Sequence, residues 1–139
     1  MTLDDWVAHG WLKEHAATPE EISKLFDIVH RETTDAASTS ISLDAQLGML
    51  YNATLKLADI ALRHRGFRAT HQRHHYRVIT SVPLTLGVEW KKTTFFLEAI
   101  QRLRHRADYE TVGLATKTQV DELAEIVRKL RTAVRDLVR

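Results

Sequence analysis

The amino-acid sequence predicts an all-α fold, an up-and-down bundle of four to five helices that forms a single domain over residues 1–139. Apolar residues recur at steps of three and four along most of the chain, which places them on one face of a helix. Only 5 Gly and 2 Pro interrupt the pattern, and no segment alternates apolar and polar residues as a half-buried strand does. A hydrophobic content of 44% beside 27% charged residues is ordinary for a globular domain, so we expect a packed core.

The first elements are a short helix around residues 3–12 and a longer helix that begins at Pro19. Thr18 can cap the longer helix, and Pro19 occupies its first turn, where the missing N–H costs no hydrogen bond. The polar residues 38–40 end this helix because such clusters favour turns.

A long central helix is predicted over residues 43–66. Two adjacent apolar stripes run along it, one made of Leu43, Leu47, Leu50, Leu57 and Ala61 and the other of Tyr51, Leu55, Ala58 and Leu62. A helix with so wide an apolar face contacts neighbours on more than one side. Gly66 is a natural C-terminal stop for it.

The second half of the chain predicts three further helices. The first covers about residues 72–86 and is distorted at Pro83, and the second covers about 89–107. A loop follows over 108–116. Along 120–137 the apolar residues alternate steps of three and four, which is typical of a helix that lies along a partner helix.

Several classes of protein are excluded by what the sequence lacks. It has no Cys, which excludes a disulfide scaffold, an iron–sulfur cluster and a thiol nucleophile. Residues 1–15 contain acidic residues and no apolar run, unlike a signal peptide, and no segment has the roughly 20 apolar residues of a membrane helix. We therefore expect a cytoplasmic protein without a cofactor and without a membrane partner.

The charge is divided along the chain. Residues 1–62 carry 4 Lys and Arg against 10 Asp and Glu, whereas residues 63–106 carry 10 against 2. Clustered cations attract polyanions, which points to a nucleic acid. The alternative is a solvated helix face that the acidic first half balances in space.

The basic segment 63–77 is the first candidate site. It contains five Arg, four His and no acidic residue, with Phe67 and Tyr76 between them. Cations beside aromatic rings suit a phosphate backbone with stackable bases. The candidate nucleic-acid-binding residues here are Arg63, Arg65, Arg68, Arg73, His74, His75 and Arg77. A metal site on His71 and the two following His is a weaker alternative because the Arg charges repel a dication, so we expect no metal.

The second candidate site is the end of the 89–107 helix, where Arg102, Arg104 and Arg106 alternate. At about 100° per residue, Arg102 and Arg106 share one face and Arg104 points nearly away from both. A purely structural role is the alternative, since Arg near a helix C-terminus interacts favourably with the helix dipole. Asp108 is more simply explained as an ion-pair partner of a neighbouring Arg than as a base.

These segments together resemble the HEPN family of small helical bundles. Residues 49–62 followed by Gly66-Phe67-Arg68 resemble the central helix of that family with its Gly-aromatic-Arg end, His74-His75 resembles the His that opens the next helix, and residues 103–109 resemble an Arg-x-x-Ala-Asp-Tyr ending. The resemblance implies a homodimer in a toxin–antitoxin or defence system, with RNA or a nucleotide as ligand. It also implies a minimal nucleotidyltransferase antitoxin as a partner.

The ribonuclease members of that family use an Arg, four to six variable residues, a His, and a Tyr two positions later. By resemblance, Arg102 and Tyr109 match the Arg and the Tyr, while Ala107 stands at the His position. The candidate catalytic residues are therefore Arg102, Arg104 and Tyr109 in a degenerate motif, with Arg106 among the nucleic-acid-binding residues.

Three hypotheses remain open at this point. The first is an RNA- or nucleotide-binding HEPN-like protein without nuclease activity. The second is a metal-independent ribonuclease in which His74, His75 or His105 replaces the missing His. The third is a non-catalytic protein-interaction module in which the Arg residues are structural.

Overall fold

The computed structural model describes the backbone of residues 1–109 and 113–139, and the side chains of these residues except 106–109. Its elements are α1 (Leu3–Ala8), β1 (Leu12–Glu14), α2 (Pro19–Ala36), α3 (Leu43–His64), β2 (Phe67–Ala69), α4 (His74–Thr80), α5 (Val82–Leu86), the 3-10 helix η1 (Val88–Trp90), α6 (Lys91–Tyr109) and α7 (Lys117–Val138). The prediction of a mostly helical bundle is confirmed. None of the described helices is long and apolar enough to cross a membrane.

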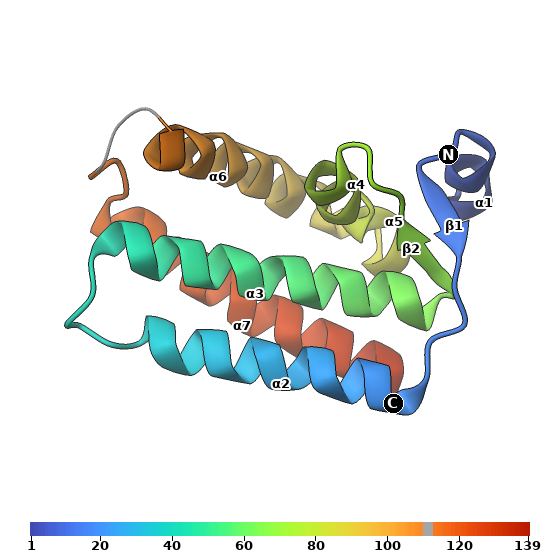
Figure 1. Cartoon of the computed structure of the whole chain (residues 1–139), viewed down its shortest axis with the longest axis horizontal. Coiled ribbons are helices and arrows are strands. Elements are labelled where there is room, and N and C mark those ends of the chain that lie inside the picture. Colours follow the sequence, from blue (N-terminus) through green and yellow to red (C-terminus); the bar gives the residue numbers. More distant parts are fainter. Residues whose placement is uncertain (110–112) are drawn as a thin grey trace.

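Helix α3 forms the centre of the bundle (Figure 1). It packs along α2 and α7, and along its other side it contacts α4, α5 and α6. Leu57, Ala58 and Ile60 are fully buried on it, as the wide apolar face predicted. The helices on both sides of the bundle therefore pack against one helix, α3.

Side-chain caps define where three of the long helices begin. The hydroxyl of Thr18 accepts a hydrogen bond from the backbone N–H of Glu21, and Ser42 accepts one from Ala45 in the same way. Thr116 forms a reciprocal capping box with Gln119 at the start of α7. These contacts satisfy N–H groups that have no partner inside the helix.

The bundle also contains two short strands, which no pattern in the amino-acid sequence indicates. β1 and β2 pair antiparallel, with Leu12 opposite Ala69 and Glu14 opposite Phe67. Each strand has only three residues, which is too short to display an alternating pattern in the sequence. The ladder instead depends on burial of Leu12, which is 2% exposed.

The single helix expected over residues 72–86 is also wrong in detail. It is two short helices, α4 and α5, that meet at Ser81. Pro83 lies in the first turn of α5, where its missing N–H is tolerated, so the proline begins a helix and does not merely distort one. The break directs α4 toward α6.

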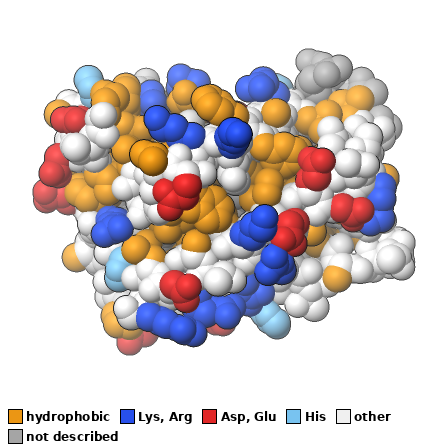
Figure 2. Space-filling view, turned by 180° about the vertical axis from the view of Figure 1, so that it is seen from behind, with side chains coloured by type: hydrophobic (Ala, Val, Ile, Leu, Met, Phe, Trp, Pro, Cys, Tyr) orange, Lys and Arg blue, Asp and Glu red, His pale blue; other side chains and the backbone are white. Residues whose placement is uncertain are grey.

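Seen from behind (Figure 2), hydrophobic side chains remain visible on the surface between groups of Lys and Arg. Apolar and charged side chains are therefore interspersed on this face. Two hollows are considered as candidate sites, one between α4 and α6 and one among α2, α3 and α7.

Candidate functional site

A cleft of about 820 Å³ lies between the beginning of α4 and the second half of α6. Its lining residues are Arg73, His74, His75 and Tyr76 from one side and Glu98, Gln101, Arg102 and His105 from the other. We call it the α4–α6 cleft. It brings together members of both segments that the sequence singled out, although they are far apart along the chain.

The two adjacent histidines in this cleft stand edge to face, with ring centroids 5.9 Å apart. Burial is the largest cause that lowers the pKa of His74, and the charge of Asp59 only partly opposes it. Burial also lowers the pKa of His75, followed by the nearby His74 and Arg104. Both rings are therefore mainly neutral at pH 7, and a neutral imidazole has a ring nitrogen that can accept a proton.

The backbone turns sharply into α4 at Arg73, which has a positive φ of 51°. Its guanidinium lies 3.9 Å from the centroid of the Tyr76 ring, so the aromatic ring holds the cation at the rim of the cleft. This stacked pair matches the pattern of cations interleaved with aromatic residues that the sequence displayed.

Arg77 points away from the cleft, toward the N-terminal segment. Its guanidinium lies 3.7 Å from the centroid of Trp11, which also stacks on the ring of His9 and meets Trp6 edge to face. Burial, followed by the charge of Arg73, lowers the pKa of Arg77. Arg77 therefore fastens the N-terminal segment to α4 and does not line the cleft.

Arg63 is occupied by acidic partners. It forms an ion pair with Glu21 of α2 and another with Asp59, whose Oδ1 lies 3.1 Å from the Arg63 Nε. The carboxylate of Glu21 also contacts His15 at 2.6 Å. Hydrogen bonds from Arg63 and then His15 lower the pKa of Glu21. This network links α2 to α3, so the structure places Arg63 in a supporting role.

Arg65 and Arg68 lie at the opposite end of α3 from the loop to α2, near the strands. Arg65 donates a hydrogen bond of 3.0 Å to the carbonyl of Thr85. Arg68 is in β2, opposite Lys13 of β1. Neither residue lines the α4–α6 cleft, so the basic segment does not form one continuous patch.

Arg102 and Arg104 face different hollows, as the helical angle predicted. Arg102 is exposed and lines the α4–α6 cleft. Arg104 lies toward α3, where its guanidinium is 5.4 Å from the centroid of the Tyr51 ring. It also lies beside Gly48, since a Cβ added to that glycine would be 3.5 Å from the Arg104 Nε. Tyr51 is buried, which raises its pKa to about 12.

Two candidate residues lie outside the described side chains. Arg106 and Tyr109 belong to the stretch of α6 for which the structure describes only the backbone. Their places as candidate binding and catalytic residues remain predictions.

Sequence reasoning did not select Glu98 and Gln101 for the cleft. Together with Arg102 and His105 they stand at positions i, i+3, i+4 and i+7 of α6, which is one face of a helix. Counting back four residues finds Glu98 from Arg102 and Gln101 from His105. Glu98 places a carboxylate among the cations and limits how negative a ligand the cleft favours at that end.

Among the described residues, no group of three or more His, Asp or Glu side chains is arranged to hold a metal ion. The cleft presents two guanidinium groups, three imidazoles, one phenol and one carboxylate to a ligand.

No family model, no curated protein and no solved structure was found to match the chain.

Proposed function

We propose that this protein binds single-stranded RNA, or a nucleotide, in the α4–α6 cleft. The observation that carries the proposal is that Arg73, His74 and His75 of the basic segment line the same cleft as Arg102 and His105 of α6. Guanidinium groups bind phosphate with two parallel hydrogen bonds. Tyr76, which borders the cleft beneath Arg73, offers a ring on which a base can stack.

A test of this proposal measures the anisotropy of a fluorescent single-stranded RNA oligonucleotide titrated with the full chain. Affinity should fall steeply between about 50 and 200 mM salt because binding releases counterions from the phosphates. Arg102→Gln should weaken binding several-fold and reduce the salt slope by about one.

The matched control is Arg135→Gln, which removes an exposed Arg from α7, away from the cleft. It should leave affinity nearly unchanged. Equal losses in both variants would mean that only the overall charge attracts RNA. An affinity that is absent or independent of salt would favour a protein-interaction module.

Ribonuclease activity is a second candidate function, and the three histidines around Arg102 favour it. In RNA cleavage a base removes the proton of a 2′-hydroxyl, the 2′-oxygen attacks phosphorus, and an acid protonates the departing 5′-oxygen. Neutral imidazoles with lowered pKa values suit the first step, while Arg102 would stabilise the charge on the phosphate.

Cleavage of end-labelled RNA in EDTA separates the two functions. If His74→Ala, His75→Ala, His105→Ala or Arg102→Ala abolishes cleavage while the fold is kept, the protein is a metal-independent ribonuclease. Salt-sensitive binding without cleavage leaves the non-catalytic RNA-binding function.

The resemblance to HEPN proteins adds to this proposal a toxin–antitoxin or defence role, a homodimer and a minimal nucleotidyltransferase partner. Val88 of η1 and Phe95 near the start of α6, which are 71% and 68% exposed, offer an apolar contact for a second protein surface. Light scattering of the purified chain, alone and mixed with a candidate nucleotidyltransferase, tests the dimer and the partner.

A further inference from the structure

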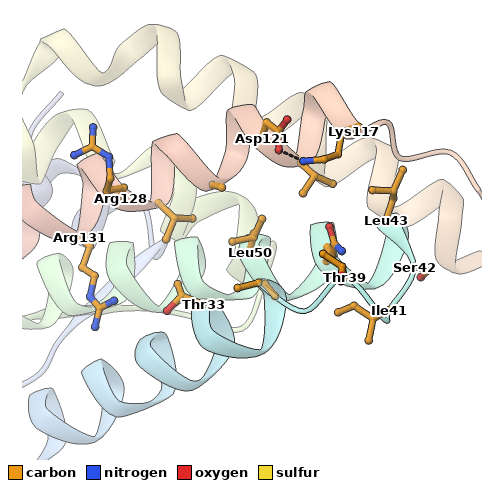
Figure 3. Close-up of a pocket in the computed structure, with 16 residues that line it drawn as sticks. Thr33, Thr39, Ile41, Ser42, Leu43, Leu50, Lys117, Asp121, Arg128 and Arg131 are labelled. Atoms are coloured by element: carbon orange, nitrogen blue, oxygen red, sulfur yellow. Dashed lines mark hydrogen bonds and ion pairs between the residues drawn. The ribbon is translucent and has the colours of Figure 1, made fainter.

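An apolar groove of about 770 Å³ lies on the opposite half of the bundle, among α2, α3 and α7 (Figure 3). We call it the α2–α7 groove. It follows α7 from Lys117 to Arg131, a distance of about 21 Å at 1.5 Å per residue. Its volume is within the range of small-molecule sites, roughly 300–1,000 Å³.

The groove is open because two helices flank α3 without closing on each other. α2 and α7 both pack along α3, and their backbones make little contact with each other. Small residues contribute to both walls of the groove, namely Ala36 and Ala37 at the end of α2 and Ala124 of α7. Small side chains leave the space above Leu50 of α3 unfilled.

Apolar side chains line the middle of the groove, and at one end they stand beside the polar Thr39, Ser42 and Lys117. In Figure 3 Leu50 lies in the middle, and Leu43 and Ile41 lie toward the end near Lys117. The charge of Lys117 at that end is compensated by an ion pair with Asp121. This part of the groove can accept a hydrocarbon chain without leaving a charge unpaired.

The other end of the groove is cationic. Arg128 is paired there with Glu125, at 2.5 Å from Nη2 and 3.0 Å from Nε. Arg131 differs, because its Nε is buried without a hydrogen-bond partner and its Nη2 has only the ring nitrogen of His30, 3.5 Å away. Across the described part of the chain, no Asp or Glu lies within 4.0 Å of Arg131.

We propose that the α2–α7 groove binds a small anionic amphiphile, with its carboxylate or phosphate on Arg131 and its hydrocarbon chain over Leu50 toward Ile41. No carboxylate of the described residues compensates the guanidinium of Arg131, and an anionic head group in the groove would supply the missing opposite charge. The uncompensated guanidinium next to an apolar channel selects against neutral and cationic chains of the same length. This site is separate from the α4–α6 cleft and does not depend on RNA binding.

Decanoate is a suitable probe, titrated below its micelle concentration into the isotopically labelled full chain and followed by amide NMR shifts. Shifts should be confined to the end of α2, the start of α3 and α7. Decyl phosphate should bind as well as or better than decanoate, decanol at least tenfold more weakly, and decyltrimethylammonium not measurably. Equal binding of decanoate and decanol would overturn the role of Arg131.

Two variants test the site itself. Arg131→Gln should weaken decanoate binding at least tenfold, whereas Arg135→Gln, which removes an exposed Arg of the same helix outside the groove, should change it less than twofold. If both variants bind decanoate like the unchanged chain, the proposal is wrong.

A third variant keeps the test decisive should Arg131→Gln fail to fold. Ala124 is exposed at the wall of the groove, so Ala124→Leu should fold normally and fill part of the channel. It should weaken decanoate and decanol to a similar degree. Undiminished binding by this folded variant would show that the hydrocarbon chain lies elsewhere.

Discussion

The α4–α6 cleft and the α2–α7 groove are both attached to α3, yet they are built in opposite ways. The cleft gathers Arg and His residues that are dense along the chain, so these residues can be selected from the amino-acid sequence alone. The groove is assembled from ordinary Ala, Leu and Val positions on three helices, with a single informative side chain, Arg131. A cluster of charged residues can be seen in a sequence, whereas a groove arises only when small side chains from separate helices pack in the folded chain.

The largest expected effect is a loss of stability of the whole bundle, which carries both the α4–α6 cleft and the α2–α7 groove. Leu57 is fully buried at the centre of α3, so Leu57→Ala should lower the free energy of unfolding by about 2–5 kcal/mol. Urea denaturation followed by circular dichroism measures this loss. RNA and decanoate binding should then decline together in proportion to the unfolded fraction. Loss of one activity alone would mean that α3 does not support both sites equally.

The next effect separates an Arg that links two helices, Arg63, from an Arg that lines the cleft, Arg102. Arg63→Ala removes the ion pairs to Glu21 and Asp59, and because these groups are partly exposed we expect a loss of about 1–3 kcal/mol in stability. RNA affinity per folded molecule should be unchanged, unlike that of Arg102→Gln. A drop in affinity comparable to that of Arg102→Gln would return Arg63 to the binding surface.

A smaller effect concerns pH and the cleft alone. His74 and His75 have lowered pKa values in the folded chain, so the unfolded chain binds more protons just below the usual value of 6.5. Stability should therefore fall as the pH falls through 6.5 toward the lower folded values. Over the same window RNA affinity should rise, by about fivefold per ring that becomes charged.

Anisotropy titrations from about pH 7.5 to 5 measure this rise in affinity, with the double variant His74→Gln and His75→Gln as the control. The double variant should give a flatter profile. Decanoate affinity, corrected for protonation of the decanoate carboxylate, should not change as His74 and His75 become charged. A rise in RNA affinity that persists in the double variant would assign the pH dependence to other groups.

The smallest effect serves as a reference for both regions. Thr18 caps α2 far from the cleft, and Thr18→Ala should cost about 0.5–1 kcal/mol of stability. Neither RNA nor decanoate affinity should change. A change in either would show that stability losses alone disturb the sites.

The long helices were predictable because their signals are local. Thr18 and Pro19 mark the start of α2, and the steps of three and four after residue 120 mark α7, as the structure confirms. β1 and β2 were not predictable, since three residues such as Phe67–Ala69 carry no period and acquire their pairing from distant Leu12.

For the candidate site, the sequence supplied the residue types but not their directions. It grouped Arg63, Arg73 and Arg77 because they are close along the chain. In the structure Arg63 forms ion pairs with acidic residues, Arg77 lies against Trp11, and Arg73 lies at the rim of the cleft. The directions of Arg73 and Arg77 follow from the turn into α4 at Arg73, which no local pattern indicated. The side of α6 that carries Arg102 was predictable, because a helix fixes the angle between positions.

The ladder of β1 and β2 also has a consequence for the order in which the chain folds. α2 and α3 are joined by a short connection and can pack early, whereas Leu12 and Ala69 meet only after the whole α2–α3 hairpin is enclosed between them. A two-stranded ladder of this length has little stability of its own. Weakening it, for example with Leu12→Ala, should accelerate unfolding and leave the refolding rate nearly unchanged. The N-terminal segment is thus held by a bundle that has already formed, and it contributes little to nucleating that bundle.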